Sequence, residues 1–388
     1  MAPGPDHKPR LAWRIKLGGR QADGTPSRVY VSIDAATGKV LIREETIQSE
    51  TGDGKSLYGG TVPLETTKSG SSYQLKDSTR GGTYTSDAQN QADFCIWIFC
   101  LWRAPNAVMT DADNHWGSGT TSDRATVAVD AQYGTNETWD FYKNVFGRVG
   151  IGGDGKGSYN RVHYDNNYAN AFWDDSCFCM TYGDGDNTNL GPLTSLDVAG
   201  HEMSHGVTSK TANLTYSGES GGLNEANSDI MGSAVEFYAN NPNDVGDYLI
   251  GEKIVRSGLG RDALRYMDKP SKDGKSADAW STGTKNLDVH YSSGVANHFF
   301  YLLSEGSGKK TINGVNYDSP TSNGSTVTGI GRDAATKIWF RALTTYMTSS
   351  TDYKAARTAT LNAAKDLFGA GSTQYNGVAA AWSAVNVN

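Results

Sequence analysis

The amino-acid sequence predicts an α+β protein with two domains, and three features of the chain support this fold class. Residues 57–196 alternate short apolar strands with turns rich in Gly, Asn and Asp. From residue 197 onward, small and apolar residues recur at helical spacing. A helix with two histidines joins the two halves and lies at the bottom of the cleft between them, where binding sites are common. A chain of 388 residues is long enough for two cores, and we place the domains at 56–196 and 197–388.

Residues 1–55 form a separate segment with a β-hairpin pattern. Val29, Val31 and Ile33 alternate with polar residues, and a turn at 35–39 leads into a second apolar stretch that begins at Val40. Alternation of this kind, interrupted by a turn, predicts two antiparallel strands.

Six helices are predicted from apolar residues at helical spacing. One lies in the β-rich half, over residues 125–146. The other five lie in the second half, over residues 197–211, 224–240, 293–304, 331–346 and 353–368.

The helix over 197–211 contains the sequence His201-Glu202-Met203-Ser204-His205. On a helix the two imidazoles, four residues apart, stand one above the other on a single face, with Glu202 beside them. Glu225 follows His205 by twenty residues, enough for a turn and a second helix to return a third ligand. Two imidazoles and one carboxylate leave the fourth position of a tetrahedral zinc site open, which is typical of catalytic rather than structural zinc.

An HExxH sequence also arises by chance on amphipathic helices, where Glu and His are ordinary solvated residues. The surrounding sequence favours a metal site. Asp229 lies one helical turn beyond Glu225, where its carboxylate can accept the outer N–H of a ligating histidine and fix the tautomer. The sequence therefore predicts one catalytic zinc ion held by His201, His205 and Glu225, with Asp229 behind them.

Several further motifs occur in an order that resembles the thermolysin family of zinc metallopeptidases, in its secreted bacterial branch. The resemblance runs from about Thr61 to the C-terminus. It rests on NAFW at 170–173, YGDGD at 182–186, HEMSH at 201–205, GGLNEANSD at 221–229, EFYANNP at 236–242, ALRYMDKP at 263–270, DVHYSSG at 288–294 and GIGRDAA at 329–335. The resemblance implies a thermolysin-like fold, in which a β-rich N-terminal half and an α-helical C-terminal half are joined by the zinc-binding helix. It also implies a secreted, extracellular zinc endopeptidase.

Four residues are expected to act in catalysis. Glu202, next to a ligand but not itself one, is placed to take a proton from water and pass it to the leaving amine. Tyr216 and His290 match the family residues that donate hydrogen bonds to the oxyanion. Asp288 is expected to orient His290 and keep it protonated, an arrangement similar to that of the elastase-like members. In thermolysin the orienting Asp lies five residues before this histidine, where the present chain has Lys285.

The resemblance also implies how a peptide substrate binds. Asn170 and the backbone of Ala171 match the edge strand to which an extended peptide adds. Arg265 matches the residue that binds the substrate carbonyl after the cut. An apolar pocket for the residue after the scissile bond is expected from four further positions, namely Leu193, Val198, Ile250 and Leu264. We therefore expect cleavage on the amino side of bulky hydrophobic residues.

Calcium is the second cofactor that the resemblance implies. An acidic cluster beside the zinc helix supplies the hard oxygen ligands that calcium prefers. It comprises Asp197, Glu236, Asp247 and Glu252, with the carbonyl of Leu249. Ser233 and Leu249 replace carboxylates of some relatives, so one ion is expected here. Asp111 and Asp113 resemble another calcium loop, although a plain Asp/Asn turn explains the same residues.

The first 55 residues resemble the C-terminal part of the family's propeptide, which would act as inhibitor and chaperone of its own enzyme. A signal peptide is not recognisable at Met1, so the sequence is expected to begin within a precursor. Maturation is expected between about Gln48 and Thr61. The alternative is an N-terminal extension of an enzyme that is not processed.

Charge and hydropathy restrict the partners. The net charge of −7 and a pI near 5.5 argue against nucleic acid and against an anionic membrane. The strongly apolar run from Phe94 to Trp102 is too short to span a bilayer, and it is predicted to be a buried strand or a covered loop. We expect a monomer that acts on peptides or proteins.

Four cysteines occur in two close pairs, Cys95 with Cys100 and Cys177 with Cys179. An even number of cysteines in a secreted protein permits disulfides, and four cysteines allow three connectivities. A Cys177–Cys179 bridge would close a very small ring, so cross-pairing stays open at this point.

Two other classes of function are compatible with these motifs. A zinc aminopeptidase shares HExxH and a distant Glu. A catalytically inactive secreted binding module would retain the fold without the chemistry, and the presence of Glu202, Tyr216 and His290 argues against it.

Overall fold

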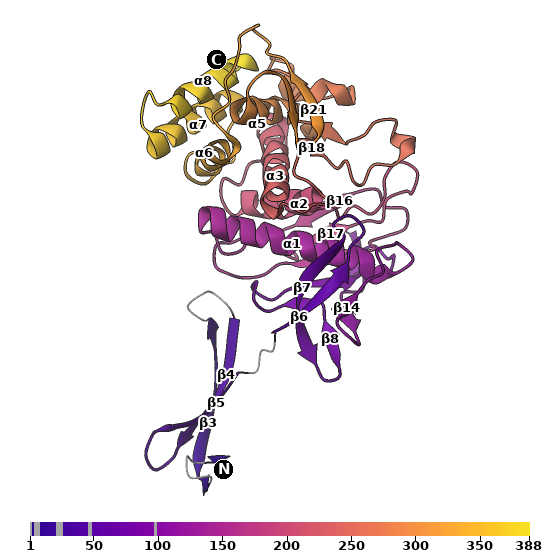
Figure 1. Ribbon diagram of the computed structural model, residues 1–388, viewed down its shortest axis with the longest axis vertical. Helices are drawn as coiled ribbons and strands as arrows, with labels where there is room; N and C mark the ends of the chain where they lie inside the picture. Colours follow the sequence, from indigo (N-terminus) through magenta and orange to yellow (C-terminus); the bar gives the residue numbers. More distant parts are fainter. Residues whose placement is uncertain (1, 4–7, 21–25, 46–48, 97–98) are drawn as a thin grey trace.

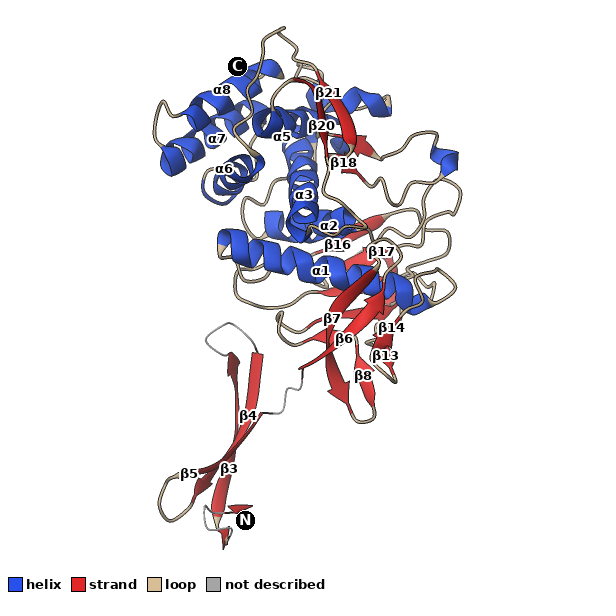
Figure 2. Ribbon diagram, viewed as in Figure 1, coloured by secondary structure: helices blue, strands red, loops and turns tan. Residues whose placement is uncertain are grey.

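The computed structural model describes residues 2–3, 8–20, 26–45, 49–96 and 99–388. A β-rich domain and a helical domain are stacked on each other, and two central helices lie at their junction (Figure 1). A separate three-stranded sheet near the N-terminus lies beyond the β-rich domain, on the side away from the helical domain (Figure 2). The predicted α+β class and its two halves are confirmed.

The N-terminal sheet has one strand more than the predicted hairpin. Its antiparallel strands are β3 (Ala12–Arg20), β4 (Pro26–Asp34) and β5 (Val40–Glu45), in this order. In the turn between β4 and β5, Asp34 accepts hydrogen bonds from the backbone N–H groups of Ala36 and Thr37. A short strand pair, β1 (Ala2–Pro3) and β2 (Pro9–Arg10), precedes the sheet.

The β-rich domain contains two five-stranded sheets. The first has the order β13-β8-β7-β6-β14. Its strands are β6 (Ser49–Lys55), β7 (Thr61–Ser69), β8 (Ser72–Gln74), β13 (Thr110–Asp111) and β14 (His115–Trp116). Strand β6 is hydrogen-bonded to β7 on one side and to β14 on the other, so residues 49–55 belong to this sheet rather than to the N-terminal one.

The second sheet has the order β16-β17-β15-β10-β9. Its strands are β9 (Lys76–Asp77), β10 (Thr83–Asp87), β15 (Tyr159–Val162), β16 (Ala171–Asp174) and β17 (Cys179–Tyr182). Strands β10, β15 and β17 run parallel, and β16 runs antiparallel to them at the edge. Among the described strands, one side of β16 therefore has no partner.

Helix α1 (Arg124–Phe146) connects the sheets to the rest of the protein. It begins where Asp123 accepts a hydrogen bond from the N–H of Ala125, and it ends at Gly147 in the left-handed conformation. A Cβ atom at Gly134 would lie 2.4 Å from the Cβ of Ala199, so glycine is required where α1 crosses the next helix. The predicted range for this helix was correct to within one residue.

Helices α2 (Leu196–Ser209) and α3 (Gly218–Ala239) form the junction of the two domains, and most of their residues are buried. The predicted start of α3 at residue 224 was wrong by six residues. Its first turns contain Gly221 and Gly222, which have low helix propensity. They are helical because Gly221 lies against Val289 and Gly222 against Ser292, where any side chain would clash.

The helical domain continues with α4 (Val289–Ser292), α5 (Gly294–Glu305), α6 (Arg332–Thr345), α7 (Tyr353–Phe368) and α8 (Thr373–Ala384). Two small sheets accompany them, β18 (Leu249–Ile250) with β19 (Arg265–Tyr266), and β20 (Gly308–Ile312) with β21 (Val315–Ser319). Helix α8 was not predicted. Its Trp382 stacks on Phe299 of α5 with ring centroids 3.8 Å apart, and both rings are fully buried.

The cysteines pair locally, Cys95 with Cys100 and Cys177 with Cys179, which excludes cross-pairing in this structure. The prediction that the apolar run from Phe94 to Trp102 is buried was wrong. It forms a separate two-stranded hairpin of β11 (Phe94–Ile96) and β12 (Phe99–Trp102), and residues 97–98 of the run lie outside the described residues. Phe94, Leu101 and Trp102 are 58%, 68% and 56% exposed.

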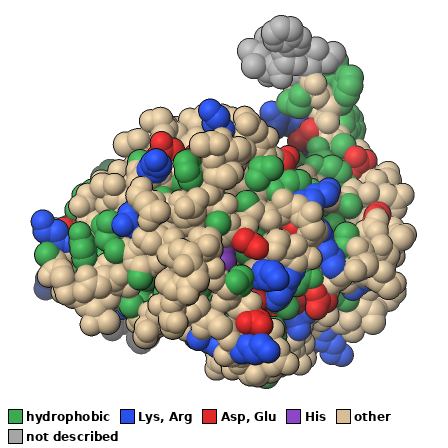
Figure 3. Space-filling view, turned by 90° about the horizontal axis from the view of Figure 1, so that it is seen from above, with side chains coloured by type: hydrophobic (Ala, Val, Ile, Leu, Met, Phe, Trp, Pro, Cys, Tyr) green, Lys and Arg blue, Asp and Glu red, His purple; other side chains and the backbone are tan. Residues whose placement is uncertain are grey.

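Among the residues that the structure describes, no helix is long and apolar enough to cross a membrane. Lys and Arg side chains are interspersed with Asp and Glu over the face seen in Figure 3, without a large patch of one sign.

Candidate active site and metal centre

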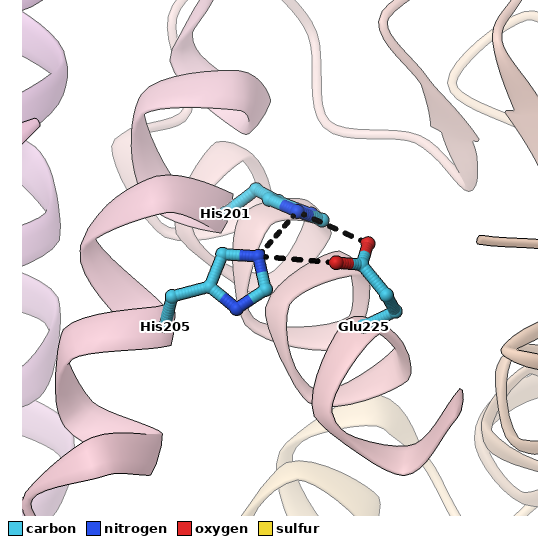
Figure 4. Close-up of side chains that lie close together, drawn as sticks. All are labelled: His201, His205 and Glu225. Atoms are coloured by element: carbon cyan, nitrogen blue, oxygen red, sulfur yellow. Dashed lines mark hydrogen bonds and ion pairs between the residues drawn. The ribbon is translucent and has the colours of Figure 1, made fainter. Parts of the chain in front are cut away.

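The side chains of His201, His205 and Glu225 point toward one another across the junction of α2 and α3 (Figure 4). The Nε2 atoms of the two histidines are 3.0 Å apart. Nε2 of His201 lies 3.5 Å from Oε2 of Glu225, and Nε2 of His205 lies 3.3 Å from Oε1. Oε2 of Glu225 is buried and has no hydrogen-bond partner among the described residues. Two imidazoles and an unsatisfied buried carboxylate fit a divalent metal ion such as zinc.

Each histidine is oriented by a hydrogen bond from its outer nitrogen. Nδ1 of His201 donates to Oδ1 of Asp229 over 2.8 Å, and Nδ1 of His205 donates to Oδ1 of Asn224 over 2.8 Å. Both bonds leave Nε2 facing the centre of the group. Such partners fix the tautomer of a metal-binding histidine and its ring orientation.

The carboxylate of Asp229 accepts several hydrogen bonds within the site. Besides the bond from His201, it accepts hydrogen bonds from Nε and Nη2 of Arg265, over 2.7 and 2.6 Å, and from Nδ2 of Asn297, over 2.8 Å. Burial alone would raise the pKa of Asp229, but Arg265 and His201 hold it well below its usual range. Asp229 therefore stays ionised and ties α3 to Arg265, one of the residues expected to bind substrate.

Glu202 lies beside the two histidines and is nearly fully buried. Its Oε2 has no hydrogen-bond partner in the part of the chain that the structure describes, and burial raises the pKa of its carboxyl group. A carboxyl group that is desolvated and left unpaired beside a reaction centre is well suited to exchange a proton near neutral pH.

Tyr216 and His290 lie on the solvent side of Glu225. The hydroxyl of Tyr216 donates to Oε1 of Glu225, and it lies 3.4 Å from Nε2 of His290. Nδ1 of His290 donates to Oδ1 of Asp288 over 2.7 Å, and the same oxygen accepts the backbone N–H of His290 at the start of α4. The structure therefore places Asp288 next to His290 and aims Nε2 of His290 at the site.

The three metal-binding side chains line one cleft of about 910 Å³ between the domains, together with Glu202, Tyr216 and His290. All seven positions expected to bind substrate line it: Asn170, Ala171, Leu193, Val198, Ile250, Leu264 and Arg265. Ala171 begins β16, the edge strand that has one free side. The cleft thus combines an open strand edge, an apolar wall and the metal-binding group.

The acidic cluster lies at the first turn of α2, beside the metal-binding group. Asp197, Glu236 and Glu252 each offer an oxygen atom within 4.8 Å of the others. Burial and the neighbouring carboxylates raise the pKa values of Glu236 and Glu252 well above their usual range, and that of Asp247 to about 7. Asp247 lies at the edge of the cluster, where its N–H donates to Glu236 and its Oδ1 accepts from the N–H of Leu249.

The Asp111–Asp113 loop is a tight turn. The backbone N–H of His115 donates to Asp113, and the imidazole of His115 contacts Asp53 on β6. Among the described residues, three acidic or histidine donors do not converge within 4.8 Å there. The second calcium site stays a prediction.

Comparisons with known proteins agree with this geometry. The profile described as "Thermolysin metallopeptidase, catalytic domain" matches residues 51–209, and that described as "Thermolysin metallopeptidase, alpha-helical domain" matches residues 212–387. The chain belongs to the thermolysin family. The predicted membership of this metallopeptidase family is confirmed, and neither alternative class is favoured.

Several relatives within the thermolysin family are similar along nearly the whole chain. The Transglutaminase-activating metalloprotease of Streptomyces mobaraensis is 62% identical over 98% of this chain and 48% of its own length. The Bacillolysin of Bacillus cereus is 39% identical over 94% of this chain and 65% of its own length. The chain therefore spans about half to two thirds of these relatives.

A solved structure is also similar. The precursor of protealysin, a metalloproteinase from Serratia proteamaculans, has a TM-score of 0.58 and 26% identity over 79% of this chain and 87% of that one.

Some residues of the site were missed by the sequence analysis. Asn224 orients His205, a role that its position next to Glu225 did not reveal. Ile254 lines the cleft together with Ile250. The spacing of four residues between these two apolar side chains was the available sign that Ile254 belongs to the same wall. Asp244 lies near Asp197, and its pKa is raised to about 7 by burial and by that neighbour. It lies in an Asn/Asp turn, so the sequence around it gave no sign of this position.

The contacts of Asp229 generate a test of the metal centre. Replacing Asp229 with Asn should weaken binding of a divalent metal by about 10–100-fold, because the amide no longer offers two anionic oxygens to His201 and Arg265. Competition between the protein and a zinc chelator measures this change. An unchanged metal affinity in a variant with the wild-type circular dichroism spectrum would contradict it.

Proposed function

We propose that the protein is a secreted zinc endopeptidase whose zinc ion is held by His201, His205 and Glu225. The observation that carries this proposal is the unpaired, buried carboxylate of Glu202 beside these three side chains, in a cleft with an open strand edge. Membership of the thermolysin family supports the same activity.

The side chains of the cleft have distinct roles in this reaction. Zinc bound by these three residues would act as a Lewis acid on the scissile carbonyl group. Glu202 removes a proton from the attacking water and then delivers it to the leaving amine. Tyr216 and His290 donate hydrogen bonds to the carbonyl oxygen as it becomes negative, and Asp288 keeps His290 oriented for this purpose.

Cleavage within a chain, rather than removal of its first residue, is supported by the extent of the cleft. The lining residues follow β16 from Asn170 past Trp173 to Asp175. An extended peptide hydrogen-bonded to this edge would occupy positions on both sides of the cut bond.

Glu202 provides the decisive test of the reaction. Replacing Glu202 with Gln should lower kcat for an internally cleaved peptide by about 10²–10⁴-fold, because the proton acceptor is lost while the metal ligands remain. The assay uses casein and a peptide with both ends blocked, and zinc content is measured in parallel as the control. Retained cleavage in the zinc-loaded variant would refute the mechanism, and failure of the wild-type enzyme on blocked peptides would favour an aminopeptidase.

We propose that the apolar wall determines the cleavage position. Leu193, Val198, Ile250, Ile254 and Leu264 line the cleft and are largely apolar and buried. Burial of a large aliphatic or aromatic side chain among them contributes about 1.5–3 kcal/mol.

Digestion of a peptide library should therefore give cuts mainly before Leu, Ile and Phe. Replacing Leu264 with Asp should reduce this preference by at least about tenfold, because it places a charge in the pocket. Cuts of the wild-type enzyme that cluster before Lys or Asp would contradict the assignment.

We also propose that Asp197, Glu236, Asp247 and Glu252, with the carbonyl of Leu249, bind at least one structural calcium ion. The carboxylates lie close together and are largely buried, and Oε1 of Glu236 and Oε2 of Glu252 have no hydrogen-bond partner within the described ranges. A divalent cation would relieve their mutual repulsion. Asp244, which lies near Asp197, is a candidate for an additional contact.

Calcium at 100 times its dissociation constant should stabilise the fold by about 2.7 kcal/mol. Replacing Glu252 with Gln should remove most of this gain, which thermal unfolding with and without calcium measures. Equal stabilisation of the variant and the wild type would argue against the site.

We propose that the segment before Ser49 is a propeptide that inhibits and assists its own enzyme, and that the mature protein is a monomer. Strand β6 is paired on both sides within the first sheet, which favours a cut upstream of the boundary predicted at residue 55. Sequencing the N-terminus of the active secreted protein should give a start at or before Ser49. A start beyond Lys55 would show that β6 is dispensable.

A further inference from the structure

The hairpin formed by β11 and β12 presents large apolar side chains to solvent. Phe94 pairs with Trp102, and Cys95 pairs with Cys100 through backbone register and a disulfide. Phe94, Leu101 and Trp102 are all more than half exposed. Phe94 and Trp102 lie opposite each other in the hairpin, and an exposed apolar patch on a folded protein often marks an interaction site. We refer to these three side chains as the apolar hairpin.

The base of the apolar hairpin is held firmly. Asp93 accepts a hydrogen bond from the backbone N–H of Ala104 over 2.8 Å, which joins the two arms. The same carboxylate accepts from Nη1 of Arg161 over 2.7 Å, and the N–H of Asp93 donates to the hydroxyl of Tyr164 over 2.9 Å. The disulfide closes the arms above this base. The exposed side chains are therefore presented at a fixed place, which lowers the entropic cost of binding.

The base of the apolar hairpin and the wall of the cleft share one aromatic cluster. Ala104 packs with Tyr164, and Tyr168 and Phe172 pack against them. The rings of Tyr164 and Phe172 are 5.7 Å apart and meet edge to face. Phe172 belongs to β16 and lines the cleft. The base of the apolar hairpin is therefore continuous with the substrate-binding edge.

The strand directions show which part of a substrate passes the apolar hairpin. Because β16 runs antiparallel to its neighbours, its first residues lie at the sheet end where β10 leads into the hairpin. At this end the carbonyl of Asn170 accepts from the N–H of Gly183, and the carbonyl of Gly183 accepts from the N–H of Leu193. Leu193 lines the pocket assigned to the residue after the cut. Substrate residues that follow this position, toward the substrate's C-terminus, therefore leave the cleft at the end of the sheet where β16 begins.

We propose that the apolar hairpin is a second binding surface for protein substrates, which takes an extended apolar segment on the carboxyl side of the cut bond. This inference rests on the proposed endopeptidase function. The shared aromatic cluster favours a substrate segment over other occupants, because it joins the base of the hairpin to the end of the cleft over which the substrate leaves. The net charge of −7 disfavours an anionic lipid surface.

Two peptides with one cleavage sequence provide the test. The short peptide ends two residues after the cut, and the long one continues for about ten residues that include Leu, Val and Phe, a reach of roughly 33 Å. The double substitution Leu101→Ser and Trp102→Ser should lower kcat/KM for the long peptide about fivefold or more, through KM. The same substitution should leave the short peptide unchanged.

Two controls separate binding from a general loss of structure. Leu367→Ser with Phe368→Ser removes two exposed apolar side chains from α7 and should change neither substrate. A long peptide with Ser and Gly in place of its apolar segment should lose its advantage with the wild-type enzyme and should not respond to the hairpin substitution.

Three results would overturn the proposal. The first is an equal loss for the short and the long peptide, and the second is no loss for either. The third is a hairpin variant with unchanged kinetics that has lost another interaction of the wild-type protein. Lost binding to lipid vesicles would assign the surface to lipid, and a lost dimer in size-exclusion chromatography would assign it to a second copy of the chain. If the wild-type enzyme cleaves the short peptide, the endopeptidase assignment survives any of these; if it cleaves neither peptide, both proposals fail.

Discussion

The close crossing of α2 and α3 is the constraint on which the site depends. A Cβ atom at Gly200 would lie 3.0 Å from the Cα atom of Gly232, and one at Gly232 would lie 2.5 Å from the carbonyl oxygen of Asp197. Glycine in the middle of a helix costs about 0.5–1 kcal/mol relative to alanine. Here it lets two backbones touch, which brings the imidazoles on one helix within about a hydrogen-bond length of Glu225 on the other.

Unsatisfied carboxylate oxygens are concentrated around this crossing. Within the described part of the chain, Glu202 and Glu225 each have a buried oxygen without a hydrogen-bond partner, as do Glu236 and Glu252 at the acidic cluster. Buried polar groups in folded proteins are nearly always paired, so a group of exceptions in one place indicates bound cations or catalysis. By contrast, Asp229 is fully paired and buried, and it supplies the rigid support that the unpaired groups lack.

Local patterns in the sequence predicted much of this arrangement. The two halves, the long helix at 124–146 and the position of Glu225 opposite His201 and His205 follow from periodicity and spacing. The start of α3 and the existence of α8 do not. Gly221 and Gly222 are helical only because other segments pack on them, and α8 depends on the stacking of Trp382 on Phe299.

The apolar run at residues 94–102 shows a second limit of sequence reasoning. Composition identifies side chains that avoid water but does not show whether the same chain covers them, so a core strand and an exposed binding hairpin have the same pattern. Asn224 illustrates a third limit. Its role depends on the direction of one side chain toward His205, which no spacing rule specifies.

One helix carries both groups of candidate ligands, since Asp197 and His201 lie a single turn apart on α2. A disturbance of the backbone in that turn reaches both groups at once. A substitution that shifts this turn is therefore expected to displace candidate ligands of both groups together, so that stability and activity would change at the same time.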